Sequence, residues 1–294
     1  MNIPQEALRQ AYLDACETEL QAFKPGNVSV YSAGHDMTVE DFRHSAQASA
    51  APLCDPALSL GERIFQAVKA TREAAGCNTN LGIVLLAAPL LDACIQGMPG
   101  KSLRENLQEV LKSTTREDAD WVFQAIRLAA PGGLGQSEEQ DVHSAPTVTL
   151  LAAMEIAANR DRIAWQYVNS YADVFDLAIP RYYKGMSAWN DEAWAAVAVF
   201  VELLNAVPDS HVERKFGPGL HPAMADKMAL IDRALSAADR PERVLPLLRE
   251  VDAEFKSAGI NPGTTADLTV ACLLAARLEK LLEAGIQPAA RLPA

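Results

Sequence analysis

The sequence predicts an all-α fold, a single multi-helix globular domain over residues 1–294. Nearly every long segment places apolar residues at intervals of three and four, which is the stripe that an amphipathic helix buries. Alanine is abundant in these segments, and the alternating β-branched pattern that strands need is almost absent. Hydrophobic residues make up 49% and charged residues 22% of the chain, as in folded globular proteins.

The helical stripe is clearest at the two ends of the sequence. Residues 4–23 carry Leu8 and Tyr12 on one face. The last segment begins at Thr264 or Thr265, either of which can cap a helix. Further helices are predicted at residues 39–52, 59–75, 81–96, 102–112, 115–130, 145–175, 188–206, 221–237 and 241–258.

Charge and cysteine content limit the partners and the compartment. The net charge of -12 disfavours nucleic acid and anionic membranes, because both attract a basic surface. The five cysteines include no CxxC pair and their number is odd, so neither a disulfide framework nor a zinc site is indicated. The apolar stretch 81–95 is too short to span a bilayer, and the first ten residues do not resemble a signal peptide. We therefore expect a cytoplasmic protein that binds small molecules, and a homo-oligomer is compatible with these features.

Five polar connections, rich in glycine or proline, separate the predicted helices. They cover residues 24–37, 76–80, 131–143, 208–217 and 259–265. Loops on a rigid helical frame are where binding chemistry tends to be found. We therefore expect these connections to converge on one cleft.

The first two connections allow a structural and a functional interpretation. The proline and glycine after Lys24 can simply end a helix, whereas Lys24 and Asn27 can hold phosphate oxygens. Likewise, Asn78 or Asn80 can cap the next helix, and a helix N-terminus also offers N–H groups to an anion. The sequence alone leaves both interpretations open.

Charged side chains in the first and fourth connections have the same two interpretations. The run that holds Asp209 and Arg214 can be a solvated turn. If it is functional, Arg214 is the best guanidinium for a bidentate phosphate contact. Asp36 can bind magnesium or accept a proton.

Five ordered motifs connect these observations to a known family. They are ExxxxKPGNV (19–28), a DM followed by a DF (36–42), GxNTNLG (76–82), PDSHVERKFG (208–217) and NPGTTADL (261–268). Each motif is weak alone, but the set in this order is specific. From Glu19 to about Leu274 the chain resembles the triphosphoribosyl-dephospho-CoA synthase family.

The resemblance implies an all-helical transferase. Such an enzyme breaks the N-glycosidic bond of ATP, releases adenine, and joins the triphosphoribosyl group to the 2′-hydroxyl of dephospho-CoA. By position, the resemblance implies substrate and phosphate binding by Lys24, Asn27, Asn78, Asn80 and Arg214, catalysis by Asp36 and Asp267, and Mg²⁺ binding by Asp36 or Asp209. A carboxylate suits this chemistry, since positive charge builds at the ribose C1′ atom and the attacking hydroxyl must lose a proton.

Two differences from the citrate-lyase branch of this family leave the identity of the acceptor open. In the citrate-lyase branch an arginine separates the histidine and aspartate of the first loop, whereas here His35 precedes Asp36 directly. That branch also has NTH where this chain has NTN, ending at Asn80. The chain looks closer to similar proteins of archaea and methylotrophic bacteria.

Two other functions compete with the transferase. The His35–Asp36 dipeptide also occurs in helical metal-dependent phosphohydrolases, but those enzymes need a metal-binding histidine upstream, and His35 is the first histidine of this chain. A non-catalytic nucleotide-binding protein would be favoured if the five connections lay far apart in space.

Overall fold

In the part of the chain that the structure describes, all regular secondary structure is helical, as predicted. The computed structural model describes residues 3–32, 37–98, 100–132 and 139–286. Over these ranges a π-helical turn, η1 (Asp173–Ala178), and a 3-10 turn, η2 (Pro241–Val244), accompany the α-helices. The α-helices are α1 (Gln5–Gln21), α2 (Val39–Leu53), α3 (Leu60–Ala75), α4 (Leu81–Ile95), α5 (Leu103–Ser113), α6 (Arg116–Ala129), α7 (Leu150–Ala157), α8 (Arg162–Val168), α9 (Ile179–Trp189), α10 (Glu192–Ala206), α11 (Ser210–Phe216), α12 (His221–Ala237), α13 (Leu245–Ser257) and α14 (Gly263–Ile286).

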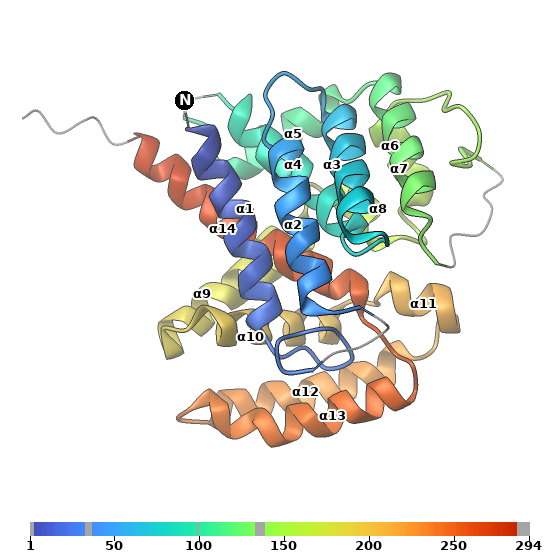
Figure 1. Ribbon diagram of the computed structural model, residues 1–294. Helices are drawn as coiled ribbons and strands as arrows, with labels where there is room; N and C mark the ends of the chain where they lie inside the picture. The colour runs from blue at the N-terminus through green and yellow to red at the C-terminus, as the bar shows by residue number, and fades with distance from the viewer. Residues whose placement is uncertain (1–2, 33–36, 99, 133–138, 287–294) are drawn as a thin grey trace, which may run out of the picture.

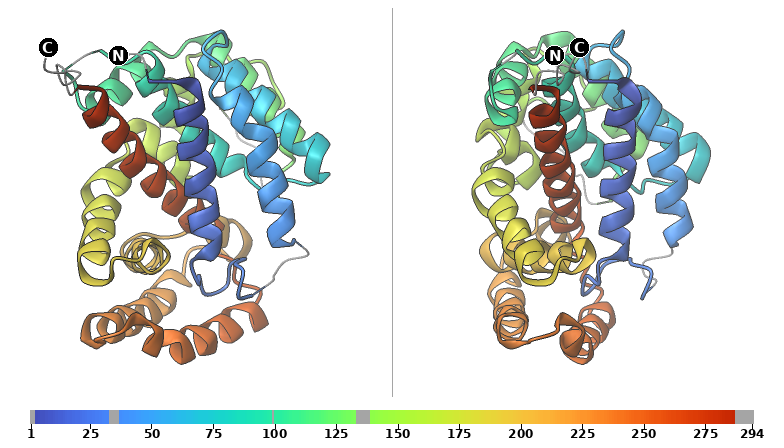
Figure 2. Two further views of the ribbon diagram at one scale, coloured as in Figure 1. Left: turned by 60° about the vertical axis from the view of Figure 1, so that its left-hand side comes forward. Right: turned by 90° about the vertical axis from the view of Figure 1, so that its left-hand side faces the viewer.

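Helix α14 is the centre of the fold. It packs against α1, α4 and α10 and crosses the molecule diagonally in Figure 1. Helices α2, α3 and α6 pack in sequence on one side of this centre. The hairpin of α12 and α13 forms a separate layer at the bottom of Figure 2, where α12 contacts α10. The buried apolar side chains of these layers join into one hydrophobic core.

Local sequence fixes where several helices begin. In a capping box, a Ser or Thr side chain accepts the N–H group three residues on, and the acid at that third position accepts the N–H of the cap. The four boxes are Thr38 with Asp41, Ser59 with Glu62, Ser102 with Glu105, and Thr115 with Asp118. For this reason the predicted starts at 39, 59, 102 and 115 agree with α2, α3, α5 and α6 to within one residue.

The helix predicted over 145–175 was wrong, because α7, α8 and η1 occupy this region as three shorter elements. Asp161 starts the second of them, since its side chain accepts the N–H groups of Ile163 and Ala164. Ser170 and Tyr171 then adopt left-handed backbone conformations, with φ of 50° and 56°, which no α-helix can contain.

Two further corrections concern the middle of the chain. The helix predicted over 188–206 is preceded by α9, which the sequence analysis missed and which ends at Asn190 in a left-handed conformation. The fourth connection, predicted as a loop, contains α11 over Ser210–Phe216. Its seven residues are too few and too charged to show an apolar stripe.

A buried tyrosine compensates for a proline inside α4. Pro89 has no N–H group, so it cannot bond the carbonyl of Leu85 one turn earlier. The hydroxyl of Tyr167 donates to that carbonyl over 2.6 Å, and Tyr171 donates to the carbonyl of Leu86 over 3.1 Å. Both tyrosines are fully buried, and Tyr167 supplies the one donor that Pro89 removes from the helix.

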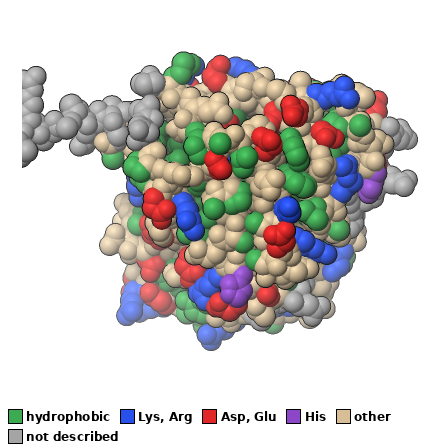
Figure 3. Space-filling view, turned by 45° about the horizontal axis from the view of Figure 1, so that its top comes forward, with side chains coloured by type: hydrophobic (Ala, Val, Ile, Leu, Met, Phe, Trp, Pro, Cys, Tyr) green, Lys and Arg blue, Asp and Glu red, His purple; other side chains and the backbone are tan. Residues whose placement is uncertain are grey.

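The surface carries mixed charge on the face shown in Figure 3. Acidic and basic side chains are interspersed there with apolar ones, so the net charge of -12 is not gathered into one acidic patch among the side chains drawn in colour. No single helix of the described residues is long and apolar enough to cross a membrane; α10 and α11, which are bent by 49°, pass that test by length and composition only when taken together.

We predict that Tyr167→Phe lowers the free energy of unfolding by about 1–3 kcal/mol, because it leaves a buried carbonyl without a donor. Urea denaturation followed by circular dichroism measures this change. Tyr183→Phe is the matched control, since Tyr183 is 40% exposed, and it should stay within about 0.5 kcal/mol of wild type. Equal stability of wild type and Tyr167→Phe would show that the hydrogen bond contributes nothing.

Candidate active site

One pocket gathers all five predicted connections. Its volume is about 600 Å³, within the range of roughly 300–1,000 Å³ that is usual for ligand sites. Asn27, Asn78, Asp141, Arg214 and Asn261 each represent one connection in its lining. The convergence predicted from the sequence is therefore confirmed for the described residues.

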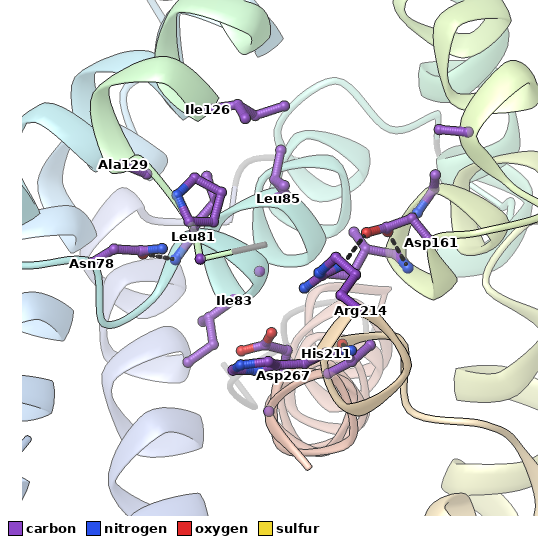
Figure 4. A pocket seen from close by; sticks show the side chains of 18 of the residues that line it. Asn78, Leu81, Ile83, Leu85, Ile126, Ala129, Asp161, His211, Arg214 and Asp267 are labelled. Atoms are coloured by element: carbon purple, nitrogen blue, oxygen red, sulfur yellow. Dashed lines mark hydrogen bonds and ion pairs between the residues drawn. The ribbon is translucent and has the colours of Figure 1, made fainter. Parts of the chain in front are cut away.

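The pocket has an apolar and a polar half. The apolar half is lined by side chains of α4, α6 and α7, among them Leu81, Leu85, Ile126 and Ala129 (Figure 4). Facing them in the same view are the polar side chains of Asp161, His211, Arg214 and Asp267. A ligand with an apolar and a charged portion matches this division.

Asp267 projects from the first two turns of α14 against the start of α4. The two helices meet so closely that a Cβ atom built on Gly82 would lie 2.0 Å from Asp267 Oδ2. Burial raises the pKa of Asp267 well above its usual range, and the negative charges of Asp209 and Glu19 raise it further. The protonated form of Asp267 is therefore favoured relative to that of an exposed aspartate.

Gly263, the glycine of the NPGTTADL motif, also lies close to the side chain of His211. A Cβ atom on Gly263 would lie 2.4 Å from His211 Nδ1, so glycine at the first residue of α14 makes room for the imidazole. The backbone N–H of His211 also donates to the hydroxyl of Thr264 over 3.2 Å. These contacts bring a titratable ring beside Asp267 (Figure 4).

Asp209 has a structural role in place of the predicted metal contact. It is 1% exposed and does not line the pocket. Its Oδ1 accepts the N–H of Val212 over 3.0 Å, and its Oδ2 accepts the N–H and the hydroxyl of Thr265 over 2.7 and 2.8 Å. One carboxylate thus caps α11 and α14 together, and with both oxygens bonded to donors it does not face a cation.

Arg214 lies where a phosphate contact requires it. It lines the pocket from α11, and its Nη1 donates to Asp161 Oδ2 over 2.8 Å. Asp161 also caps α8, so the ion pair orients the guanidinium from a fixed helix end. The Arg214 side chain remains 29% exposed, so its other donors can reach a ligand.

The three asparagines predicted for the site differ in their placement. Asn27 lines the pocket and donates to Asn261 Oδ1 over 2.8 Å, which joins the first connection to the fifth. Asn78 lines it too, and its side-chain oxygen accepts the N–H of Leu81 over 3.2 Å, so it holds the start of α4. Asn80 lies behind the pocket wall, where its amide donates to Ser49 over 3.3 Å.

Lys24 is also placed differently from its prediction. It is fully buried and lies outside the pocket lining, and its Nζ donates to the carbonyls of Glu19 and Val28 over 2.7 and 2.9 Å. The ammonium also lies 3.1 Å from the carboxylate of Glu19. A lysine after a helix and before Pro-Gly resembles an exposed loop residue, and its burial follows only from tertiary packing.

Asp36 and His35 lie outside the described residues, so the predicted catalytic and metal-binding roles of Asp36 stay predictions. The next residue, Met37, lines the pocket. Among the described residues, no group of three His, Cys, Asp or Glu side chains could hold a metal ion.

Five charged pocket residues had no predicted role in the site: Glu19, Arg72, Glu139, Arg160 and Asp161. Arg160 and Asp161 fell inside the segment predicted as one helix, and their turn has a signal in the N-cap aspartate. Arg72 lies in the last turn of α3, which has no sequence signal for function.

The sequence of this chain matches that of a known protein family. A sequence model of the family described as ATP:dephospho-CoA triphosphoribosyl transferase (CitG) matches residues 5–285. The chain belongs to this family. It is therefore a transferase, as its motifs predicted.

A solved structure gives independent support for the fold. It comes from Archaeoglobus fulgidus, is described as a triphosphoribosyl-dephospho-CoA synthase, and matches with a TM-score of 0.60 at 24% sequence identity. The match covers 80% of this chain and 97% of that one. No curated protein matches the chain.

We predict that Gly82→Ala reduces transfer by about a hundredfold or more, because the added methyl group must displace the carboxylate of Asp267. The release of adenine from ATP measures the rate, and circular dichroism checks the fold. Gly132→Ala is the control, since Gly132 also lines the pocket but has no atom within 4 Å of an added Cβ. Equal rates for both variants would refute the role of this close approach.

Proposed function

We propose that this pocket transfers the triphosphoribosyl group of ATP to a hydroxyl group of a dephospho-CoA-type acceptor, with release of adenine. The observation that carries the proposal is the carboxylate of Asp267, whose pKa burial raises, in one pocket with the guanidinium of Arg214 and an apolar wall. Cleavage of a glycosidic bond needs such a group, because the leaving base must gain a proton and the hydroxyl must lose one.

The triphosphate would bind in the polar half. Arg214 lines this half, Arg72 and Arg160 also line the pocket, and the starts of α4 and α14 add the positive ends of two helix dipoles. Asn27 and Asn78 would complete the polar wall. The apolar half offers a surface on which the purine and the carbon chain of the acceptor can be buried.

Magnesium would arrive with the triphosphate. Five carboxylates line the pocket against three guanidinium groups, so its walls do not neutralise the phosphates. Mg²⁺ commonly binds through one or two carboxylates and the phosphates themselves, so a preformed cluster of three protein ligands is not required. Five free cysteines, four of them buried, support a reducing compartment, and we place the enzyme in the cytoplasm.

The proposed function is tested by incubating the protein with ATP, magnesium and dephospho-CoA and analysing the products by mass spectrometry. We expect free adenine together with an acceptor that has gained the triphosphoribosyl group. A reaction without acceptor serves as control. Formation of ADP or AMP with no release of adenine would contradict the proposal.

We predict that ATP binds at least about tenfold more weakly in excess chelator than with magnesium, a difference of about 1.4 kcal/mol. The reason is the excess of carboxylates over guanidinium groups in the pocket. Titration calorimetry measures both affinities. Adenosine is the control ligand, since without phosphates it should bind equally in both conditions, and equal ATP affinities would contradict the prediction.

A further inference from the structure

Glu19 is a buried carboxylate of the same pocket. It lies in the last turn of α1, is 5% exposed, and lines the same pocket as Asp267. Its residue type opens the ExxxxKPGNV motif, but nothing so far accounts for a carboxylate at this position. A buried acid at the end of an amphipathic helix is costly unless a partner stabilises it.

The partner is Lys24, which the fold holds in one position. Its Nζ lies 3.1 Å from Glu19 Oε1 and donates to the carbonyls of Glu19 and Val28. These carbonyls come from the end of α1 and from the turn after it, so the Pro-Gly turn wraps the ammonium. Because the ammonium cannot move away, the carboxylate is fixed beside the pocket in contact with a positive charge.

Glu19 and Asp267 therefore face one pocket in different surroundings. Burial raises the pKa of Glu19, and the contact with the Lys24 ammonium opposes this shift and favours the charged carboxylate. Among the described residues, no basic group lies within ion-pair distance of Asp267, and the charge of Glu19 itself helps to raise the pKa of Asp267. Two acids whose surroundings differ in this way commonly take opposite roles in acid–base catalysis.

We propose that Glu19 is the ionised carboxylate that faces the reacting ribose and takes the proton of the acceptor, while Asp267 gives its proton to the departing adenine. This assignment rests on the proposed transfer. Lys24 acts as a positioning residue, because it contacts Glu19 and lies outside the pocket lining.

The bonds, protons and electrons of this step balance. The bond between C1′ and N9 of ATP breaks as Asp267 protonates the adenine ring, and the electron pair of the bond leaves with the base. The acceptor oxygen bonds to C1′, and its proton passes to Glu19. Transfer of a proton from Glu19 to Asp267, directly or through water, restores the starting state, and no oxidant or reductant is needed.

The test compares Glu19→Gln with Glu17→Gln. Glu17 lies on the same helix and is also paired with a cation, Arg43, but it does not line the pocket. With ATP, magnesium and the acceptor, we expect kcat for adenine release to fall about a hundredfold or more in Glu19→Gln and less than about twofold in Glu17→Gln. ATP affinity measured by calorimetry should change less than about threefold in both variants.

Two further variants keep the test decisive if the amide leaves Lys24 uncompensated. Glu19→Gln combined with Lys24→Met removes both charges, so it should fold and bind ATP while remaining inactive. Sodium formate should raise the rate of adenine release by Glu19→Ala at least about tenfold, because the small anion replaces the carboxylate. The rate of Glu17→Ala should not change in formate. A structural role alone would not produce this rescue.

The outcomes separate this assignment from the proposed function. If wild type releases no adenine with any acceptor, the proposed function fails. If wild type is active and folded Glu19→Gln keeps kcat within about threefold, Glu19 has no part in proton transfer and the assignment is overturned. Failure of formate to raise the rate of folded Glu19→Ala would also count against it.

Discussion

The carboxylate of Asp209 determines how the active site is assembled. It is buried, no salt bridge joins it to a basic side chain among the described residues, and it accepts the N-terminal N–H groups of both α11 and α14. Free N–H groups at helix starts carry partial positive charge, so two helix ends supply what a lysine or arginine would supply elsewhere. Because one side chain caps both helices, their relative position is fixed to within the tolerance of a hydrogen bond.

The positions of the reacting groups follow from this junction. Arg214 and His211 belong to α11 and Asp267 belongs to α14, so the double cap brings a cation, an imidazole and an acid to one pocket. The glycines at 82 and 263 then permit contacts that any side chain would block. Rigid helix ends, rather than mobile side chains, provide the preorganisation that group transfer requires.

The sequence predicted the helices well where local rules decide them. Capping boxes and apolar periodicity are local, so α2 and α12 begin at the predicted residues. The shared polar character of the connections also predicted their convergence. By contrast, α11 is short and charged, and the break at Asp161 depends on a cap inside an otherwise continuous pattern, so local propensity favoured the wrong state at both places.

The membership of the candidate site was predicted only in part. Asn27, Asn78, Arg214 and Asp267 line the pocket, whereas Lys24, Asn80 and Asp209 lie outside its lining. Whether a polar residue of a loop contacts a ligand or a backbone group depends on tertiary packing, which no spacing encodes. The contact of Glu19 with Lys24 likewise distinguishes it from Asp267, and this contact cannot be read from residue type.

The proline in α4 has an evolutionary consequence. Pro89 leaves the carbonyl of Leu85 without a donor in the helix, and the hydroxyl of Tyr167 bonds that carbonyl. The effect of each residue on stability therefore depends on the other. A lineage that replaced the proline would regain an N–H donor within the helix, and selection for a hydroxyl at the tyrosine would then relax. We therefore expect substitutions at these two positions to be epistatic and to covary among relatives, although 78 residues separate them in the chain.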